Sequence, residues 1–410
     1  MSEQTQTTTE KSVDPDLEKR MREFSTYEVS TEDAFSLYED ARAAGCPVFH
    51  SDKLDGFEAV IDYDDVRAAH MDWETFNSGP QVLRPLAPRP RFPPIEYDGA
   101  EHKAWRDLFS QVLNPKAPTI HRDGVREDIV EQIGKLEEMG EFDLQADFAE
   151  EIPLLALCRL IGFDKELRGE VRRHTRAMHG AAGDAEAGAK AFLEFAEFGA
   201  GEVQKRVENP RDDFLTVLAQ WEIDGRPLKP EELGATMNSF LNAGHGTTVS
   251  GMTSLLWEVF RNEELKGKLI DDMSLIPKCV EESMRLHTPF FGLYRTATRD
   301  ATLPSGAEIK EGQSALMCWA AANRDPKVFE NPDEIDLDRE YGRNRLMTFG
   351  YGPHGCMGRP MAQMEMEVAL EELLTRLPDI ELIDPDDVRH EFAGSETALI
   401  ESLPARLPSS

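Results

Sequence analysis

Apolar positions recur every three to four residues along most of the chain, a spacing typical of amphipathic α-helices. Helices are predicted over residues 31–45, 99–112, 120–138, 144–162, 165–179, 187–208, 231–262, 273–286 and 361–377. Strand-like stretches are short and fall in two zones. The first zone holds CPVFH and FEAVIDY near the N-terminus; the second holds GLYRTAT, ATLPSGAEIKEGQSALMCWA and TALIESLPARL. The pattern therefore predicts a mainly α fold with small β-sheets.

The stretch LNAGHGTTVSG, residues 241–251, interrupts the helical pattern in the middle of the predicted helix 231–262. Each of its glycines costs helix stability, roughly 1 kcal/mol relative to alanine. The hydroxyls of Thr247 and Thr248 can also compete for backbone carbonyls. A long helix weakened at its centre in this way indicates a functional role for the stretch.

No internal repeat and no Gly/Ser-rich linker divides the chain. We therefore expect residues 16–410 to form a single large domain, preceded by a disordered arm over residues 1–15. The polar start lacks the apolar segment of a signal peptide, and no run of about 18 apolar residues predicts a membrane span. Five scattered cysteines without a C-x-x-C pair are typical of a reducing compartment, so a cytoplasmic location is expected.

The composition is strongly acidic, with 78 Asp and Glu residues against 45 Lys and Arg residues and a net charge of −33. A charge of this sign argues against nucleic acid or an anionic membrane as a partner.

The segment FGYGPHGCMG, followed by a helical pattern, carries the clearest chemistry in the chain. Its glycines permit sharp turns and the close approach of a flat or bulky group. Cys356 precedes the helix, whose N-terminal dipole and free N–H groups favour a thiolate. A nucleophilic cysteine would use a base, and His354 is available, whereas a structural zinc site would need further ligands at a suitable spacing. The residues alone leave haem ligation and nucleophilic catalysis open.

FGYGPHGCMG resembles the haem-binding loop of the cytochrome P450 family, the haem-thiolate monooxygenases. The resemblance implies the α-rich cytochrome P450 fold and a haem b whose iron is bound by the thiolate of Cys356. The loop positions that match the family pattern are Phe349, Gly350, Gly352, His354, Cys356 and Gly358.

Further matches to the family follow in the expected order. EESMR resembles the family's E-x-x-R motif and implies a structural pair, Glu282 and Arg285, joined by Arg339 of FENPDEIDLDR. GAEHKAWRD and YRTATRD resemble segments that bind the haem propionates. They imply that role for His102, Arg106 and Arg295, together with His354.

AGHGTT resembles the family's oxygen-binding groove. The resemblance implies that Ala243 and Gly244 make room over the haem and that Thr247, followed by Thr248, helps protons reach the bound oxygen. Gly246 stands where the family usually has an acid, and no carboxylate lies between Leu233 and Trp257. We expect protons to arrive through water and Thr247, or through His245 or Glu396.

By the same resemblance, the substrate pocket is lined by the proline-rich loop, the central helix and two later segments. The candidate lining residues are Val82, Leu83, Leu86, Phe92, Phe240, Asn242, Ala243, Thr247, Phe290, Phe291, Leu293, Glu396, Thr397 and Ala398. The phenylalanines suit a terpenoid or an alkylaromatic compound. The alternative substrate is an aromatic acid, which could be bound by Arg84, Arg89 and Arg91 unless nearby acidic residues pair with these arginines.

The sequence shows no fused reductase domain, so electrons are expected from a separate iron–sulfur ferredoxin, or a flavodoxin, and its NAD(P)H reductase. They would dock near Arg359, on the cysteine side of the haem. The expected activity is insertion of one atom of O2 into a small hydrophobic molecule. Alternatives are a peroxide-driven peroxygenase, which the missing acid favours, a non-catalytic haem ligand sensor, and a cysteine hydrolase.

Overall fold

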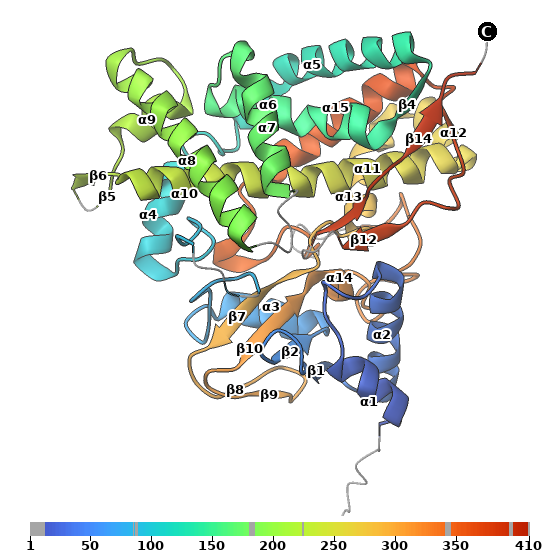
Figure 1. Ribbon diagram of the computed structural model, residues 1–410. Helices are drawn as coiled ribbons and strands as arrows, with labels where there is room; N and C mark the ends of the chain where they lie inside the picture. Colours follow the sequence, from blue (N-terminus) through green and yellow to red (C-terminus); the bar gives the residue numbers. More distant parts are fainter. Residues whose placement is uncertain are drawn as a thin grey trace, which may run out of the picture.

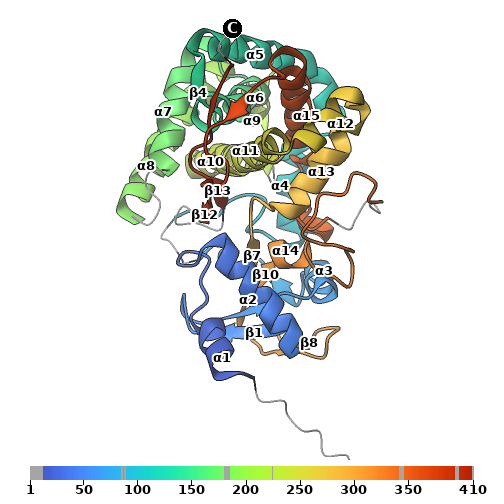
Figure 2. The same cartoon turned by 90° about the vertical axis from the view of Figure 1, so that its right-hand side faces the viewer.

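The computed structural model describes residues 13–84, 86, 89–179, 185–223, 225–340, 346–392 and 397–408. Most helices gather in one part of the molecule, while the largest sheet lies with α1 and α2 in the other (Figure 1). The view turned by 90° shows the same division (Figure 2). The predicted mainly α fold with small β-sheets is confirmed.

The helices are α1 (Pro15–Arg22), α2 (Thr31–Ala44), α3 (Tyr63–Met71), α4 (Gly99–Phe109), α5 (Ala117–Met139), α6 (Glu151–Ile161), α7 (Arg168–His179), α8 (Ala185–Glu208), α9 (Phe214–Gln220), α10 (Pro230–Gly244), α11 (Gly246–Arg261), α12 (Glu263–Asp271), α13 (Ile276–Leu286), α14 (Trp319–Ala322) and α15 (Arg359–Arg376). Each predicted helical range contains a helix, whereas α1, α3, α9, α12 and α14 were not predicted. A π-helix (Leu144–Ala149) precedes α6, and short 3-10 turns cover Lys165–Leu167, Met273–Leu275 and Gly352–His354.

The strands are short. They are β1 (Val48–Ser51), β2 (Phe57–Val60), β3 (Phe76–Asn77), β4 (Glu141–Asp143), β5 (Glu222–Ile223), β6 (Arg226–Pro227), β7 (Gly292–Ala297), β8 (Ala301–Thr302), β9 (Glu308–Ile309), β10 (Ser314–Cys318), β11 (Glu381–Leu382), β12 (His390–Phe392), β13 (Ala398–Ile400) and β14 (Pro404–Arg406). The largest sheet has the order β1-β2-β10-β7-β3, in which only β2 and β10 run parallel.

The β7–β10 pair brings two distant segments to the interior. Gly292 pairs with Cys318, and a Cβ at Gly292 would lie only 2.1 Å from Met317 O, so this approach requires glycine. The neighbouring register pairs Leu293 with Met317, and β10 continues directly into α14. The sheet therefore presents the start of β7 and the start of α14 to the helical part.

The predicted helix 231–262 is two helices, α10 and α11, which run end to end through the helical part (Figure 1). They meet at His245, whose φ of −91° and ψ of −74° lie outside regular α-helical values. Glycines on both sides of His245 lower the cost of this break. A single uninterrupted helix was thus the wrong prediction, although the weakened stretch was located correctly.

The first residues described are Val13 and Asp14, and the Asp14 carboxylate caps α1. Residues 1–12 of the predicted arm lie outside the described residues, while Pro15 belongs to α1. Among the described residues, none of the helices combines the length and the hydrophobicity that a membrane crossing requires.

Candidate active site

One interior cavity collects most of the residues that the sequence singled out. Its walls come from the proline-rich loop, α4, α10, α11, the start of β7, the cysteine loop and the segment before β13. The predicted residues that line it are Val82, Leu83, Phe92, His102, Arg106, Phe240, Asn242, Ala243, Gly244, Thr247, Thr248, Phe290, Leu293, Phe349, His354, Cys356, Gly358 and Thr397. Segments more than 300 residues apart in the chain thus share one enclosed space.

Several predicted residues do not line this cavity. Phe291 is buried on the other side of the sheet, with its ring centroid 5.5 Å from that of Phe35. The reason is that side chains alternate along an extended strand, so Phe290 and Phe291 point to opposite faces. Placing Phe291 in the pocket was therefore wrong. Other predicted residues outside the described lining are Leu86, Gly246, Gly350, Gly352, Arg295 and Ala398, and Glu396 lies outside the described residues.

The cysteine loop turns sharply and presents its sulfur to the cavity. Gly350 and Gly352 have φ values of +66° and +67°, in the left-handed region that favours glycine. The loop closes through a hydrogen bond from Cys356 N to Phe349 O at 2.8 Å. All five cysteines are described, and Cys356 alone among them lines the cavity.

The thiol of Cys356 lies in a mixed environment. Its accessible surface faces the cavity, and the surrounding protein raises the pKa of the thiol by burial. The backbone N–H groups of Gly358 and Arg359, at the start of α15, act in the opposite direction and lower that pKa. These N–H groups stabilise negative charge on sulfur, which suits a metal-bound thiolate.

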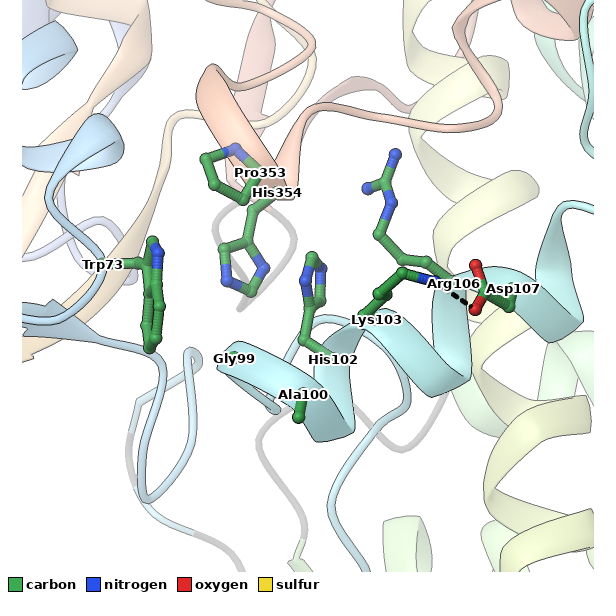
Figure 3. Close-up of a pocket in the computed structure, with 9 residues that line it drawn as sticks. All are labelled: Trp73, Gly99, Ala100, His102, Lys103, Arg106, Asp107, Pro353 and His354. Atoms are coloured by element: carbon green, nitrogen blue, oxygen red, sulfur yellow. Dashed lines mark hydrogen bonds and ion pairs between the residues drawn. The ribbon is translucent and has the colours of Figure 1, made fainter. Parts of the chain in front are cut away.

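Histidine and arginine side chains meet at one end of the cavity. Figure 3 shows the imidazoles of His102 and His354 facing each other, and their ring centroids are 4.1 Å apart. Arg106 lies one helical turn beyond His102 and donates from Nη1 to Gly355 O at 2.8 Å. Burial, followed by the charges of His354 and Arg106, lowers the pKa of His102 to about 4. Burial likewise lowers the pKa of Arg295 to about 10.

This end of the cavity has unused hydrogen-bonding capacity. Three buried nitrogens have no hydrogen-bond partner among the described residues: His102 Nε2, His354 Nδ1 and Arg295 Nη2. One acid, Asp98, accepts from His354 Nε2 at 3.0 Å. Buried donors of this kind are costly unless an acceptor reaches them, and an anionic ligand would satisfy them. A cysteine thiolate for the iron, beside unpaired nitrogens for the propionate carboxylates, fits a haem.

At the α10–α11 junction, the hydroxyl of Thr247 is bonded to the preceding turn. Thr247 Oγ1 donates to Ala243 O at 2.7 Å, and the residue is half-buried against the cavity. A Cβ at Gly244 would lie 2.9 Å from the Leu157 side chain, so a small residue keeps this turn close to α6. The junction therefore presents a hydroxyl and small residues to the cavity.

His245 does not supply the missing acid. Its Nε2 lies 2.9 Å from Glu150 O, the residue is 1% exposed, and it is absent from the described cavity lining. Because its imidazole is directed toward Glu150, the expectation that His245 delivers protons into the cavity receives no support.

Glu365 of α15 is a cavity residue that sequence reasoning missed. It is 6% exposed, its Oε2 has no hydrogen-bond partner among the described residues, and burial raises its pKa well above the usual range. A signal was present: Glu365 lies four residues after Met361 and three before Val368, on the buried stripe of α15. An acid on an apolar stripe indicates either a buried pair or a protonated carboxyl group.

The proline-rich loop is organised by a buried carboxylate. Glu96 is 0% exposed and accepts from Arg89 Nη1 and Nη2 at 2.8 and 2.9 Å. It also accepts from Val82 N at 3.1 Å and Phe92 N at 2.7 Å, so it fixes two lining residues. Arg89 is thus neutralised by Glu96, and its guanidinium carbon lies 3.7 Å from the centre of the Phe92 ring.

The other two loop arginines are also turned to protein partners. Arg84 Nη2 donates to Ser314 Oγ at 3.2 Å, and Arg91 lies over the Tyr97 ring at 4.1 Å. None of the three arginines is among the described lining residues. The cavity wall consequently offers no arginine from this loop to a substrate carboxylate.

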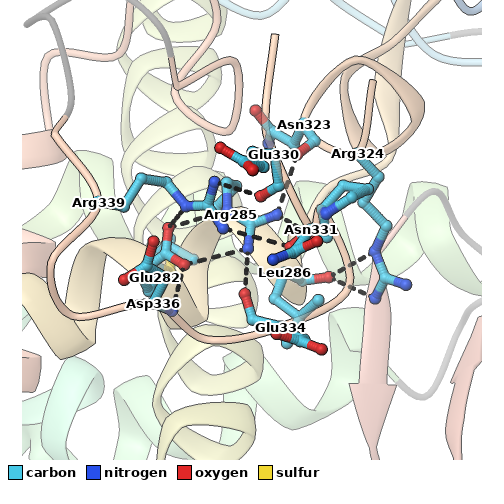
Figure 4. Close-up of polar contacts among 12 residues, drawn as sticks. Glu282, Arg285, Leu286, Asn323, Arg324, Glu330, Asn331, Glu334, Asp336 and Arg339 are labelled. Carbon is cyan, nitrogen blue, oxygen red and sulfur yellow. Dashed lines mark hydrogen bonds and ion pairs between the residues drawn. The ribbon is translucent and has the colours of Figure 1, made fainter. Parts of the chain in front are cut away.

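The predicted structural trio forms a buried network (Figure 4). Glu282 Oε1 accepts from Arg285 Nε at 2.9 Å and from Arg339 Nε at 3.0 Å. Arg285 also donates to backbone carbonyls, including Asn323 O at 3.2 Å, and Asn323 Oδ1 accepts from Met347 N at 2.8 Å. Because Met347 lies just before the cysteine loop, this network holds the start of that loop in place.

Comparison with known proteins agrees with this geometry. The family model for cytochrome P450 matches residues 173–405. Mycinamicin IV hydroxylase/epoxidase of Micromonospora griseorubida is 32% identical over 363 residues, covering 85% of this chain and 88% of the relative. The chain belongs to the cytochrome P450 family.

Other cytochromes P450 extend the comparison. The steroid C26-monooxygenase of Rhodococcus jostii is 31% identical over 83% of this chain and 74% of the relative. The crystal structure of CYP108D1 from Novosphingobium aromaticivorans superposes with a TM-score of 0.85 at 26% identity, covering 97% of this chain and 99% of that one. As a cytochrome P450, the protein is a monooxygenase that carries haem through a cysteine thiolate and uses O2, an organic substrate and a redox partner.

Proposed function

We propose that this cytochrome P450 inserts one oxygen atom from O2 into a neutral, hydrophobic small molecule, in the size range of a terpenoid or an alkylaromatic compound. The observation that carries the proposal is the described cavity wall, which is mostly apolar and takes no charged side chain from the proline-rich loop, α10 or α11. The loop arginines that could bind an acid are engaged with Glu96, Ser314 and Tyr97. An aromatic acid is therefore the less favoured substrate.

In this proposal each predicted residue has a task around a bound haem. Cys356 provides the thiolate, His102, Arg106, Arg295 and His354 bind the propionates, and Phe349, Gly350 and Gly358 shape the loop. When bound, haem supplies the iron at which O2 is activated. The sequence has no C-x-x-C-H attachment motif, which favours the non-covalent haem b. Residues 16–410 would form one haem domain.

The substrate class can be tested by titrating the purified ferric protein and recording its Soret band. We expect neutral terpenoids and alkylaromatics to convert the spectrum from low spin to high spin, because they can fill the apolar cavity and displace water. Aromatic carboxylic acids are titrated in the same way for comparison. A shift confined to the acids, and lost on replacing Arg84, Arg89 or Arg91, would contradict the proposal.

Glu365 is proposed as the group that holds a proton for the reaction. A carboxyl that is buried without a partner is neutral, and Glu365 lines the same cavity as Thr247. The position is close to α11, because a Cβ at Gly251 would lie 3.4 Å from the sulfur of Met366. Thr247 Oγ1 can accept a hydrogen bond while it donates to Ala243 O, so it can receive a proton delivered through water.

The Glu365→Gln variant keeps the shape of the side chain but removes its proton. We expect product formation to slow on the order of 10²-fold while NAD(P)H is still consumed and peroxide is released. Product and peroxide are measured per NAD(P)H. Glu367→Gln, which alters a half-buried acid outside the described lining, is the control. Gly246→Asp should recover part of the coupling in the Glu365→Gln background; unchanged coupling in Glu365→Gln would refute this role.

Electrons are proposed to come from an iron–sulfur ferredoxin, or a flavodoxin, with its NAD(P)H reductase. Arg359 Nη2 donates to Glu281 at 2.9 Å, so this arginine is neutralised rather than free to attract an acidic partner. Turnover with a purified ferredoxin and reductase tests the donor. Because Gly246 leaves the usual acid position empty, peroxide-driven turnover without any partner is the second candidate activity.

A further inference from the structure

Ser239 in α10 has a hydroxyl without a hydrogen-bond partner. The residue is 8% exposed, Oγ is buried, and the side chain lines the cavity. Several hydroxyl and amide side chains on α10 and α11 donate to the carbonyl four residues earlier. They are Thr236 to Glu232 O at 2.8 Å, Asn238 to Gly234 O at 2.9 Å, Asn242 to Asn238 O at 3.0 Å, Thr247 to Ala243 O at 2.7 Å and Thr253 to Val249 O at 2.8 Å. By contrast, Ser250 donates to Ala398 O and Ser254 pairs with His390 Nε2.

The unpaired hydroxyl is unusual because a serine inside a helix normally donates to an earlier carbonyl or to water. A buried polar group without a partner costs stability, which an apolar residue at this position would avoid. Met237 and Phe240 nearby are apolar and buried, and the adjacent buried Asn238 is bonded to Gly234 O. A ligand in the cavity is a candidate partner for this hydroxyl.

The position of Ser239 relative to the chemistry is set by the helix. Ser239, Asn242 or Ala243, and Thr247 fall on one face, because they are spaced by three or four residues. Ser239 precedes Thr247 by eight residues, which corresponds to about 12 Å along the helix axis. All four therefore line one wall of the cavity, with Ser239 about two helical turns before Thr247.

The charge of the lining also depends on position. The ionisable side chains among the described lining residues are His102, Arg106, His354, Cys356 and Glu365, which belong to α4, the cysteine loop and α15. α10 contributes only uncharged side chains to the described lining. A charged group near Ser239 would have no counter-ion there, so the complementary ligand group is neutral.

We propose that Ser239 determines specificity by hydrogen-bonding a hydroxyl or carbonyl oxygen of the substrate. The substrate would be an apolar molecule with that oxygen at one end, oxidised at its other end, roughly 10–12 Å away, which is the spacing of Ser239 from Thr247 across the α10–α11 junction. This inference rests on the proposed function, since it assumes that oxidation occurs beside Thr247.

The test compares ligands that differ in one hydroxyl. Ferric, haem-loaded protein is titrated with bicyclohexyl and with 4-cyclohexylcyclohexanol, and the dissociation constants are obtained from the Soret band and from calorimetry. We expect the alcohol to bind roughly five- to tenfold more tightly, as one hydrogen bond provides. In Ser239→Ala, this preference should disappear while the affinity for the hydrocarbon changes less than about twofold.

Thr236→Val is the matched control, since it removes a hydroxyl that bonds Glu232 O one turn earlier and lies outside the described lining. It should keep the preference for the alcohol. Ser239→Ala should also leave the melting temperature unchanged or raised, because no protein hydrogen bond is lost. Dodecane and 1-dodecanol provide a flexible second pair.

Several results would overturn the assignment of Ser239. They are equal binding of alcohol and hydrocarbon in both pairs, a preference that persists in Ser239→Ala, or a lowered melting temperature of that variant. Failure of the proposed function is distinguishable, because it would show as a protein without a thiolate-type Soret spectrum in its carbon monoxide complex.

Discussion

Cys356→Ser is expected to abolish the thiolate-type Soret spectrum of the carbon monoxide complex and all monooxygenase turnover. Cys356 is the cysteine of the chain that lines the cavity, and Gly358 and Arg359 direct backbone N–H groups at its sulfur. A serine hydroxyl is far less acidic than a thiol and donates less electron density to iron, so the push that favours O–O cleavage is lost. The spectrum is recorded on reduced, haem-reconstituted protein.

Cys46→Ser provides the comparison, because Cys46 is partly buried in the N-terminal core and lies outside the described cavity lining. It should keep both the spectrum and the activity. A thiolate-type spectrum that survives in Cys356→Ser would mean that another cysteine binds the iron.

Arg285→Ala is expected to cause the largest loss of stability among the substitutions considered. Arg285 and Glu282 are both 0% exposed, so truncating the arginine leaves the Glu282 carboxylate buried without one of its cationic partners. Removing one member of such a buried pair typically costs about 3–5 kcal/mol of unfolding free energy. The variant also loses donors to Asn323 O and Glu334 O, which weakens the support of the cysteine loop. Denaturant unfolding of the haem-loaded protein measures the change.

The control breaks an ion pair of the same chemistry on the surface. Glu264 and Lys268 lie 2.7 Å apart and are exposed, and Glu264→Ala should change the unfolding midpoint little. Haem retention should fall in Arg285→Ala and remain normal in Glu264→Ala. Equal stability of the two variants would show that the buried network does not hold the fold together.

Local interactions explain why so much of this protein was predictable. Helical periodicity depends on which face of a helix is buried, so the spans of α2, α4, α5, α8 and α15 matched their predictions within a few residues. The cysteine loop was also predictable, because its glycines and the following helix are neighbours in the chain. The weakened centre of the long helix was visible, but its division at His245 depends on the backbone that this histidine adopts and on its contact with Glu150.

The sequence by itself determined the fold class, the position of the cysteine loop and the pairs within one helix, because these follow from residues close together in the chain. Tertiary structure alone decided which side of the sheet receives Phe291, that Glu96 neutralises Arg89, and that Glu365 and Ser239 border the same cavity as Cys356. The side that receives Phe291 depends on how the start of β7 is set in the sheet, and the other outcomes depend on contacts between distant segments; neither periodicity nor spacing encodes them.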